Sequence, residues 1–445
     1  MNTAEHMDAA AKKKSLDISL FKGAFGVLTT GFTQEFFTPF ILFLGAGARQ
    51  VGILNGTINM VSACVQLFSA EMVEKIGSRK NMVSVFILVQ LTVLLTIVVL
   101  ALTGKIHYWT FIVLAVVFVT AGMVFHPAWL SFLCDLAGDN KRGTYFGWRS
   151  RNLGLLSVVG MITGGVILYN MEHRNLLYGF CLLFGLGFLA RLLSFLSLQR
   201  MQEPPLTYNK EDVFSFLQFF LRLKKSNFAK FVLFVSTMNF SVNLAAPYFA
   251  VFMLKDLSFN YLTYSAVTFI APLTLFLSVR RWGQHADKVG SLKVLQLTSK
   301  CFPLIPLLWI LDQAPWYLLM VEMFSGFLWA GFNLCAANFI YDAASPQKRT
   351  RCIAYFNVLN GFALSCGALL GGFLVKYLPS LFGHKLLMLF FISAILRLIV
   401  SWTMSRMIKE VRNVEHIKSL DLFFSMIRLR SIPGNDRNSL RNAQV

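Results

Sequence analysis

The chain contains twelve long apolar segments, and this feature limits its possible folds more than any other. A helix needs about 20 apolar residues to cross the hydrocarbon core of a membrane. The segments are residues 20–44, 48–72, 81–103, 108–133, 144–169, 175–198, 228–254, 259–281, 293–311, 315–340, 352–378 and 385–408. They lack the strict alternation of apolar and polar residues that is typical of membrane β-barrels. We therefore expect an all-α membrane protein with twelve transmembrane helices.

The composition supports this class. Hydrophobic residues make up 56% of the 445 residues and charged residues only 14%, whereas a soluble protein carries about 25% charged residues. The seven cysteines are scattered and form no C-x-x-C pair, so neither a disulfide framework nor a zinc site is expected. We expect no metal and no cofactor.

The basic residues indicate the orientation of the helices. There are 41 Lys and Arg residues against 21 acids, and most of the basic residues lie at the two termini and in alternate connections. By the positive-inside rule both termini are cytoplasmic. The charge surplus is then a signal of topology and of anionic lipid, and it requires no nucleic-acid partner. We expect the inner (plasma) membrane of a bacterium, since the outer loops show no glycosylation sequon.

The segments predict five regions along the chain. A cytoplasmic N-terminal segment (1–19) precedes a six-helix bundle (20–198). A cytoplasmic linker (199–227) contains an amphipathic stretch at 213–225 that is typical of an interfacial helix, although a solvated linker is the alternative. A second six-helix bundle (228–408) and a cytoplasmic tail (409–445) follow.

The two halves of the sequence repeat each other. AEMVEKIGSRK (70–80) matches GQHADKVGSLK (283–293) in its acidic-basic-x-Gly-Ser core. Further pairs recur at a nearly constant spacing: Pro39/Pro247, Asp135/Asp342, Arg142/Arg349, Gly154/Gly361, Gly164-Gly165/Gly371-Gly372 and Arg191/Arg397. Such internal repetition indicates two pseudo-symmetric bundles of six helices.

The repeated loop resembles the signature of the major facilitator superfamily, Gly-x-x-x-Asp-(Arg/Lys)-x-Gly-(Arg/Lys)-(Arg/Lys). The second copy keeps Gly283, Asp287, Lys288 and Gly290, while the first has Ala70 for Gly and Glu74 for Asp. The resemblance extends over residues 20–408. It implies two bundles around a central cavity and alternating access, but it does not specify a substrate.

The resemblance also implies a cytoplasmic gate of charged residues and turn glycines. A few partly buried ion pairs would change the free-energy difference between two conformers by a few kcal/mol. The alternative is a solvated basic loop that only sets topology. The gate candidates are Glu74, Gly77, Arg79, Asp135, Arg142, Asp287, Lys288, Gly290, Asp342 and Arg349.

Glu35 and Glu322 are the acids that lie well inside the apolar segments. Ionisable groups there are costly and usually functional. Glu35, whose repeat counterpart is Asn243, could couple transport to protons, or it could form an ordinary hydrogen bond between helices. Glu322 could be a second proton site, part of an outer gate, or a side chain that reaches outward. His126 is a further proton candidate, with a neutral core histidine as the alternative.

Arg149 is the leading substrate-binding candidate. It lies about 200° around the helix from Arg151 and shares a face with Asn152, so it could grip a carboxylate or phosphate. The alternative is a positive-inside anchor, and the recurring pair Arg191 and Arg397 favours a structural role. Polar and aromatic residues that could line an amphiphilic pocket are Phe36, Trp129, Asn152, Asn239, Asn243, Tyr248, Trp329, Asn333, Asn357 and Asn360.

These features predict a monomeric secondary active transporter. Its substrate would be a small organic, amphiphilic solute, and an anionic group would suit Arg149. Proton coupling is expected because carboxyl groups lie in the membrane and no P-loop for nucleotides is present. An uncoupled facilitator, a lipid scramblase and a transporter-like receptor on the same fold are the alternatives. A membrane enzyme is disfavoured, because the sequence contains no HExxH motif and no large outer domain.

Overall fold

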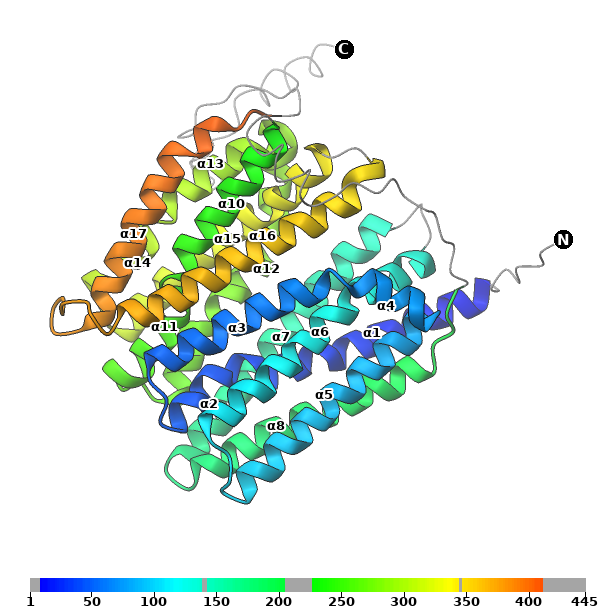
Figure 1. Ribbon diagram of the computed structural model, residues 1–445, viewed down its shortest axis with the longest axis horizontal. Coiled ribbons are helices and arrows are strands. Elements are labelled where there is room, and N and C mark those ends of the chain that lie inside the picture. The colour runs from blue at the N-terminus through cyan, green and yellow to red at the C-terminus, as the bar shows by residue number, and fades with distance from the viewer. Residues whose placement is uncertain (1–8, 138–141, 205–225, 344–345, 411–445) are drawn as a thin grey trace, which may run out of the picture.

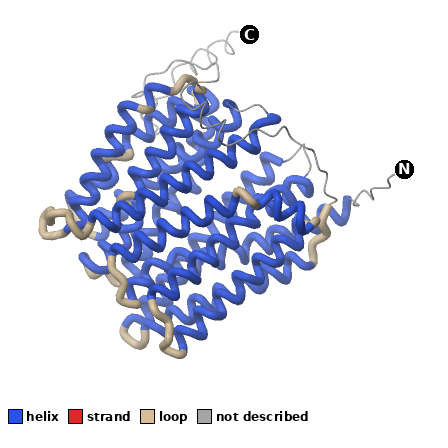
Figure 2. The backbone as a smooth tube through the Cα atoms, viewed as in Figure 1, coloured by secondary structure: helices blue, strands red, loops and turns tan. Residues whose placement is uncertain are grey.

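The computed structural model describes residues 9–137, 142–204, 226–343 and 346–410. Over these ranges the chain is almost entirely helical and forms no β-strand (Figure 2). Ten helices or groups of helices within these ranges are long and apolar enough to cross a membrane. The expected all-α membrane fold is therefore confirmed.

The helices follow one another with short connections. Those of the first half are α1 (Ala9–Phe32), η1 (Gln34–Phe36), α2 (Phe37–Phe43), α3 (Ala48–Gln66), α4 (Ser69–Ile76), α5 (Arg79–Leu102), α6 (Tyr108–Ala137), α7 (Arg142–Glu172) and α8 (Leu176–Gln199). Those of the second half are α10 (Asn227–Asn243), α11 (Ala246–Val251), η3 (Phe252–Asp256), α12 (Tyr261–Val289), α13 (Ser291–Cys301), α14 (Leu304–Leu311), α15 (Pro315–Ala343), α16 (Pro346–Leu374), α17 (Lys385–Thr403) and η4 (Ser405–Met407). The interfacial helix expected at 213–225 and nearly all of the C-terminal tail lie outside the described residues.

Four of the expected segments are divided into separate α-helices: 20–44, 48–72, 228–254 and 293–311. The segment 48–72 ends as α3 at Gln66, and a separate amphipathic helix, α4, carries the charged residues that follow. The segment 293–311 is divided into α13 and α14 around Pro303. Proline lacks the backbone donor that would continue a helix. The boundary expected at residue 72 was therefore wrong, because charged residues follow the apolar run. The segment 293–311 keeps its bounds as one span, Ser291–Leu311, which is interrupted at Pro303.

The first long helix of each half is broken at the same place. A short 3₁₀ segment, η1, separates α1 from α2, and residues 244–245 separate α10 from α11. Pro39 and Pro247 cause the breaks, because neither can donate to the carbonyl four residues earlier. Those carbonyls belong to Glu35 and Asn243. The structure therefore places both residues of this repeat pair at the helix breaks.

The packing of the helices repeats between the halves. In the first half α1 packs on α7 and α8, and α5 packs on α6 and α8. In the second half α10 packs on α16 and α17, and α13 packs on α15 and α17. The two halves meet along α3 with α16 and along α7 with α12 (Figure 1). Because α3 and α12 are the second spans of their halves and α7 and α16 are the fifth, the two contacts between the halves also repeat each other.

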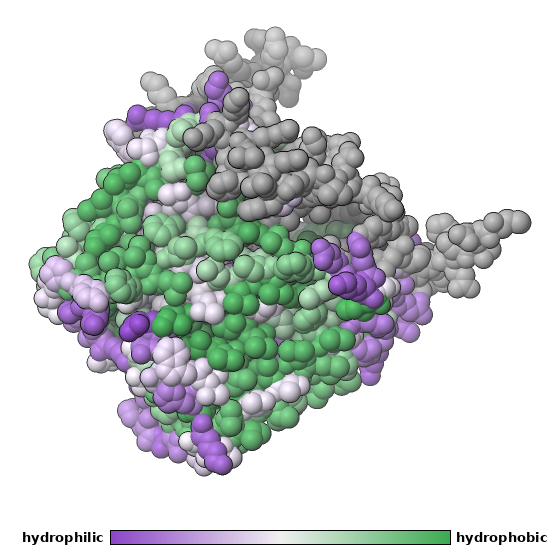
Figure 3. Space-filling view, in the orientation of Figure 1, coloured by the Kyte–Doolittle hydropathy of each residue, from purple (hydrophilic) through white to green (hydrophobic). Residues whose placement is uncertain are grey.

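The two ends of the molecule can be distinguished by their connections. We call the end where α8 ends and α10 begins the linker end (upper right in Figure 1), and the opposite end the far end. Apolar side chains cover the middle of the face shown in Figure 3, and polar side chains gather toward both ends. This distribution suits a protein that is surrounded by lipid between two aqueous layers.

Candidate functional site

Two of the predicted gate residues pair at the linker end. Arg79, which is 3% exposed, contacts Asp135 at 2.5 Å and Glu203 at 3.3 Å. Its guanidinium also donates to Ser131 and to the carbonyl oxygen of Pro204. All these residues belong to the first half. The pair formed by Arg79 and Asp135 therefore lies within the first half and does not join the two halves.

Glu203 has a counterpart in the second half that sequence reasoning missed. The Glu203 carboxylate accepts from the backbone N–H of Arg79 at 2.7 Å, at the start of α5. The Glu410 carboxylate accepts from the backbone N–H of Leu292 at 2.8 Å, at the start of α13. An acid directly after the last helix of each half was the available signal. Each half therefore ties its own third helical segment to its own end.

The other gate candidates occupy varied places at the linker end. Glu74, Asp287 and Lys288 are exposed. Gly77 and Gly290 have positive φ angles at helix ends, which only glycine adopts without strain. Asp342 lies near the end of α15. The side chains of Arg142 and Arg349 lie outside the described part of the structure.

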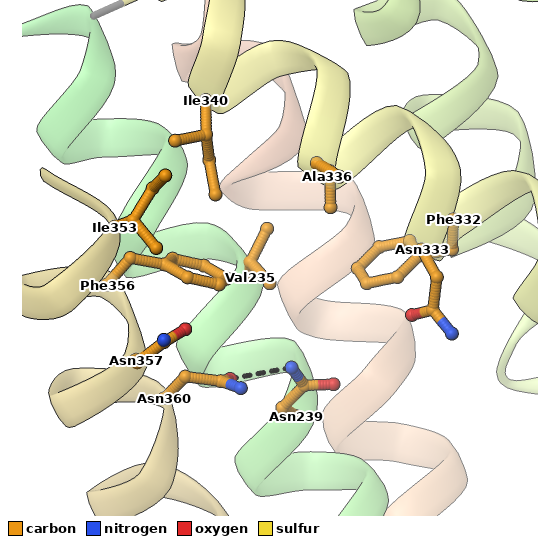
Figure 4. Close-up of a pocket in the computed structure, with 11 residues that line it drawn as sticks. Val235, Asn239, Phe332, Asn333, Ala336, Ile340, Ile353, Phe356, Asn357 and Asn360 are labelled. Carbon is orange, nitrogen blue, oxygen red and sulfur yellow. Dashed lines mark hydrogen bonds between the residues drawn. The ribbon is translucent and has the colours of Figure 1, made fainter. Parts of the chain in front are cut away.

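Four of the predicted asparagines line one cavity of about 290 Å³ in the second half (Figure 4). We call it the asparagine pocket; its polar members are Asn239, Asn333, Asn357 and Asn360. Asn239 donates to the side-chain oxygen of Asn360 at 2.7 Å. Phe332 and Phe356 supply apolar walls. Amide groups beside apolar rings are typical of sites for small polar organic molecules. Asn243 lies one turn from Asn239, to whose carbonyl it donates.

Glu322 lies in a separate cavity of about 320 Å³ that we call the Glu322 pocket. Its carboxylate accepts from the indole of Trp309 at 3.0 Å. Trp329 and Arg397 line the same cavity. The Arg397 guanidinium donates to Ser393 and to backbone carbonyls. A buried acid and a buried base thus share this pocket.

The first half contains a third cavity, of about 310 Å³, which is lined by residues of α1, η1, α5, α6, α7 and α8. Lys22, Arg149 and Arg191 line it together with His126 and Trp129, and we call it the cationic pocket. The three cations are only 4%, 6% and 6% exposed. The Lys22 ammonium lies 3.5 Å from the ring centroid of Trp129, which is a close cation–π contact.

The polar partners of these cations are neutral. Arg149 donates to the carbonyl oxygen of Ser19 at 3.2 Å, and Arg191 donates to the side-chain oxygen of Gln90. The Nε atom of Arg191 has no hydrogen-bond partner among the described residues. Within the same part of the chain, no carboxylate lies within ion-pair distance of any of the three. Burial of an unpaired charge costs several kcal/mol, so this pocket is electrostatically incomplete.

Lys22 is the residue that sequence reasoning missed. It is not among the candidates from the sequence, yet it lies on α1 beside Gly23 and Gly26, which also line the pocket. The signal was a lysine within the apolar run that begins at residue 20. Arg191, expected to be structural, also lies in this pocket.

The remaining candidates are not gathered at one site. Phe36 is fully buried and packs on Phe269 of the second half, and Tyr248 is fully buried and donates to the carbonyl oxygen of Ala368 at 2.5 Å. Asn152 lines a shallow apolar groove between α1 and α7. Glu35 lies in η1 and makes no hydrogen bond or ion pair with a described residue.

Comparison with known proteins identifies the family. Residues 23–321 match the model of the Major Facilitator Superfamily. The chain belongs to this superfamily. No curated protein matches the sequence. A crystal structure of a mutant of the nucleoside transporter NupG is similar to this major facilitator with a TM-score of 0.72 and 13% identity, over 89% of this chain and 100% of that chain.

A second solved structure has the same architecture. It is a bacterial homologue of the human lysosomal transporter Spinster in an inward-facing, unoccupied conformation. It has a TM-score of 0.61 and 12% identity, over 95% of this chain and 99% of that chain. At such identities the likeness concerns the fold alone. The chain is a major facilitator with the fold of a membrane transporter.

Proposed function

We propose that this protein is a secondary active transporter that carries a small, amphiphilic organic solute through alternating access coupled to protons. The observation that carries the proposal is the asparagine pocket, a polar cavity among helices that cross the membrane (Figure 4). Unsatisfied polar groups are costly in such surroundings. A cavity with several amide groups is therefore best explained by a solute that forms hydrogen bonds there. By the positive-inside rule, the linker end is cytoplasmic in an inner (plasma) membrane.

Contacts at the far end support alternating access. The Lys255 ammonium donates to the carbonyl oxygen of Ala46 at 2.5 Å, which joins the two halves. Nearby, Gly372 of α16 packs against the backbone of Arg49 in α3. These contacts hold the halves together at the far end. Rocking of one half against the other would exchange them for contacts at the linker end.

Glu35 supports proton coupling. It lies at the break between α1 and α2, in the same short segment as Phe36, which packs on Phe269 of the opposite half. With no cation among the described residues paired to it, a carboxyl group in this position is more easily accommodated when it is neutral. Proton binding and release at Glu35 would then change the interaction between the two halves.

Proteoliposomes loaded with a pH-sensitive dye test this function. We expect that at least one solute from a panel of small organic acids, alcohols and amides changes the internal pH in the presence of wild-type protein. Glu35→Gln should abolish this pH change with the protein still inserted, because the amide cannot take up the proton. Glu71→Gln, which removes an exposed acid on α4, is the matched control.

Other outcomes identify the alternatives. Flux of labelled solute without a pH change would identify an uncoupled facilitator and contradict proton coupling. Movement of fluorescent lipid between leaflets, with no solute flux, would identify a scramblase. An equal pH change with Glu35→Gln would exclude Glu35 as the coupling site.

A further inference from the structure

The cationic pocket contains more positive charge than the described groups around it neutralise. Lys22, Arg149 and Arg191 are buried within one cavity. Their contacts are a carbonyl oxygen, an amide oxygen and the ring of Trp129. These contacts orient the cations but leave their net charge unchanged. A buried charge of this size needs an anion nearby.

The second half of the molecule shows how such a charge is balanced. Arg397, the repeat counterpart of Arg191, shares the Glu322 pocket with a carboxylate. In the lining of the first-half pocket, as far as the structure describes it, that acid is missing, and Arg149, whose counterpart Phe356 is apolar, adds a further charge. The asymmetry is therefore not required by the fold, because the equivalent pocket is balanced by the protein itself.

We propose that the cationic pocket binds a doubly charged oxyanion group, of the phosphate monoester type, on the transported solute. This inference rests on the proposed transport function and names its substrate class. Two negative charges would offset most of the charge of the three cations. The Lys22 ammonium and the Nε atom of Arg191 provide donors that have no acceptor among the described residues. Phe118, Val119 and Met123 line the same cavity and would contact the organic body of the solute.

Thermal unfolding of the purified full chain in neutral detergent tests the proposal. The probes are phenyl phosphate, benzenesulfonate and benzyl alcohol at pH 8 and constant ionic strength, which share a ring but differ in charge. A ligand that binds only the folded state raises its stability in proportion to affinity and concentration. We expect the largest shift with phenyl phosphate, a smaller shift with benzenesulfonate and none with benzyl alcohol.

Two pairs of variants make the test specific. Lys22→Met and Arg149→Gln should weaken phenyl phosphate binding by about 30-fold or more, since each removes a buried charge contact. Lys230→Met removes the half-buried repeat counterpart of Lys22, and Arg151→Gln removes an exposed cation two residues from Arg149. Both controls should bind as wild type does. Lys22→Met should also raise the unfolding temperature of the protein without ligand, because it removes an unpaired buried charge.

Several results would overturn the proposal. One is an equal rise of the unfolding temperature with phenyl phosphate in the wild type and all four variants. The others are no rise of the wild type with phenyl phosphate, and a rise with benzyl alcohol that equals the one with phenyl phosphate. Stabilisation by phosphatidic acid in mixed micelles, but by no soluble probe, would assign the pocket to a lipid headgroup instead. Solute flux that is unchanged in Lys22→Met would reject the anion site and leave the transport function standing. Anion binding without any solute flux would support the anion site and reject the transport function.

Discussion

At the scale of single residues, the clearest structural contact is the one that Glu203 makes. Its carboxylate accepts from Ser78 at 2.6 Å and from the backbone N–H of Arg79 at 2.7 Å, and it pairs with the Arg79 guanidinium. Glu203→Gln keeps the shape but removes the charge. We expect the free energy of unfolding to fall by about 1.5–3 kcal/mol, the usual value of hydrogen bonds to charged groups. Denaturant titration in micelles measures this loss.

Glu74→Gln is the control for Glu203→Gln, because Glu74 is an exposed acid on α4. Its unfolding should match that of the wild type, since exposed charges contribute little. An equal loss in the two variants would contradict the structural role of Glu203.

Arg79 and Asp135 could be singled out from the repeated loop and its offsets. For Glu203 the sequence offered only an acid that follows the last helix of each half; its partner could not be predicted, because that depends on where the chain returns after α8.

At the scale of helices, the repeated glycines of α7 and α16 have matching roles. A Cβ atom at Gly154 would meet Phe276, and one at Gly361 would lie 2.4 Å from the Cβ of Ala63, so both glycines face the opposite half. A Cβ atom at Gly367 would lie 2.4 Å from the carbonyl oxygen of Phe240, within the same half. The missing side chains therefore allow the helices to approach each other closely.

Gly367→Ala should therefore destabilise the protein. The added methyl group would collide with the backbone of α10, and overpacking of this kind costs about 1–3 kcal/mol. Gly147→Ala is the matched control on α7, because no atom of the described residues lies within 4 Å of the position of its Cβ. Since alanine favours helix over glycine by up to about 1 kcal/mol, this control should keep or gain stability. The unfolding temperature should fall in Gly367→Ala and should stay the same or rise in Gly147→Ala. An equal fall in both variants would contradict the packing argument.

The helices themselves were largely predictable, because apolar length and glycine spacing are properties of the local sequence. The pockets between the helices could be predicted from the sequence only in part. The asparagines of α10 and α16 could be named as pocket candidates, since spacings of four and three residues place each pair on one face of its helix. The convergence of Lys22, Arg149 and Arg191 was not, because it depends on how α1, α7 and α8 pack together. Periodicity gives the face of one helix but not its neighbours.

At the scale of the whole molecule, the charged contacts described at the linker end lie within the halves. Arg79, Asp135 and Glu203 tie the first half to itself, and Glu410 ties the start of α13 to the end of its own half. The halves meet along α3 with α16 and α7 with α12, where the contacts involve glycines. Motion of one half as a rigid body would therefore leave these ion pairs intact.

A disulfide at the far end tests this motion. The position of a Cβ on residue 372 lies 3.3 Å from the Cα of Arg49, so Arg49→Cys and Gly372→Cys form a pair in direct contact across the halves. The Tyr248 hydroxyl, 2.8 Å from the same position, has to move aside for the bond. In a background without native cysteines, oxidation should stop solute exchange, and reduction should restore it. Each single cysteine variant is the control and should be insensitive to oxidant. Continued exchange in the cross-linked protein would exclude opening of the far end as a step of transport.

The same locked protein also reveals which side its cavity faces. His126 on α6 and Asn333 on α15 are repeat counterparts, and both are exposed although each lies within a membrane-spanning helix. If the far end is closed, a membrane-impermeant maleimide should reach His126→Cys and Asn333→Cys in inside-out vesicles but not in intact cells. Leu277→Cys, on an exposed apolar position of α12, should react poorly from both sides because lipid covers it. Labelling of the cavity cysteines from the far end would show that rocking of two rigid halves is the wrong description, since closure at the far end and access from that end exclude each other.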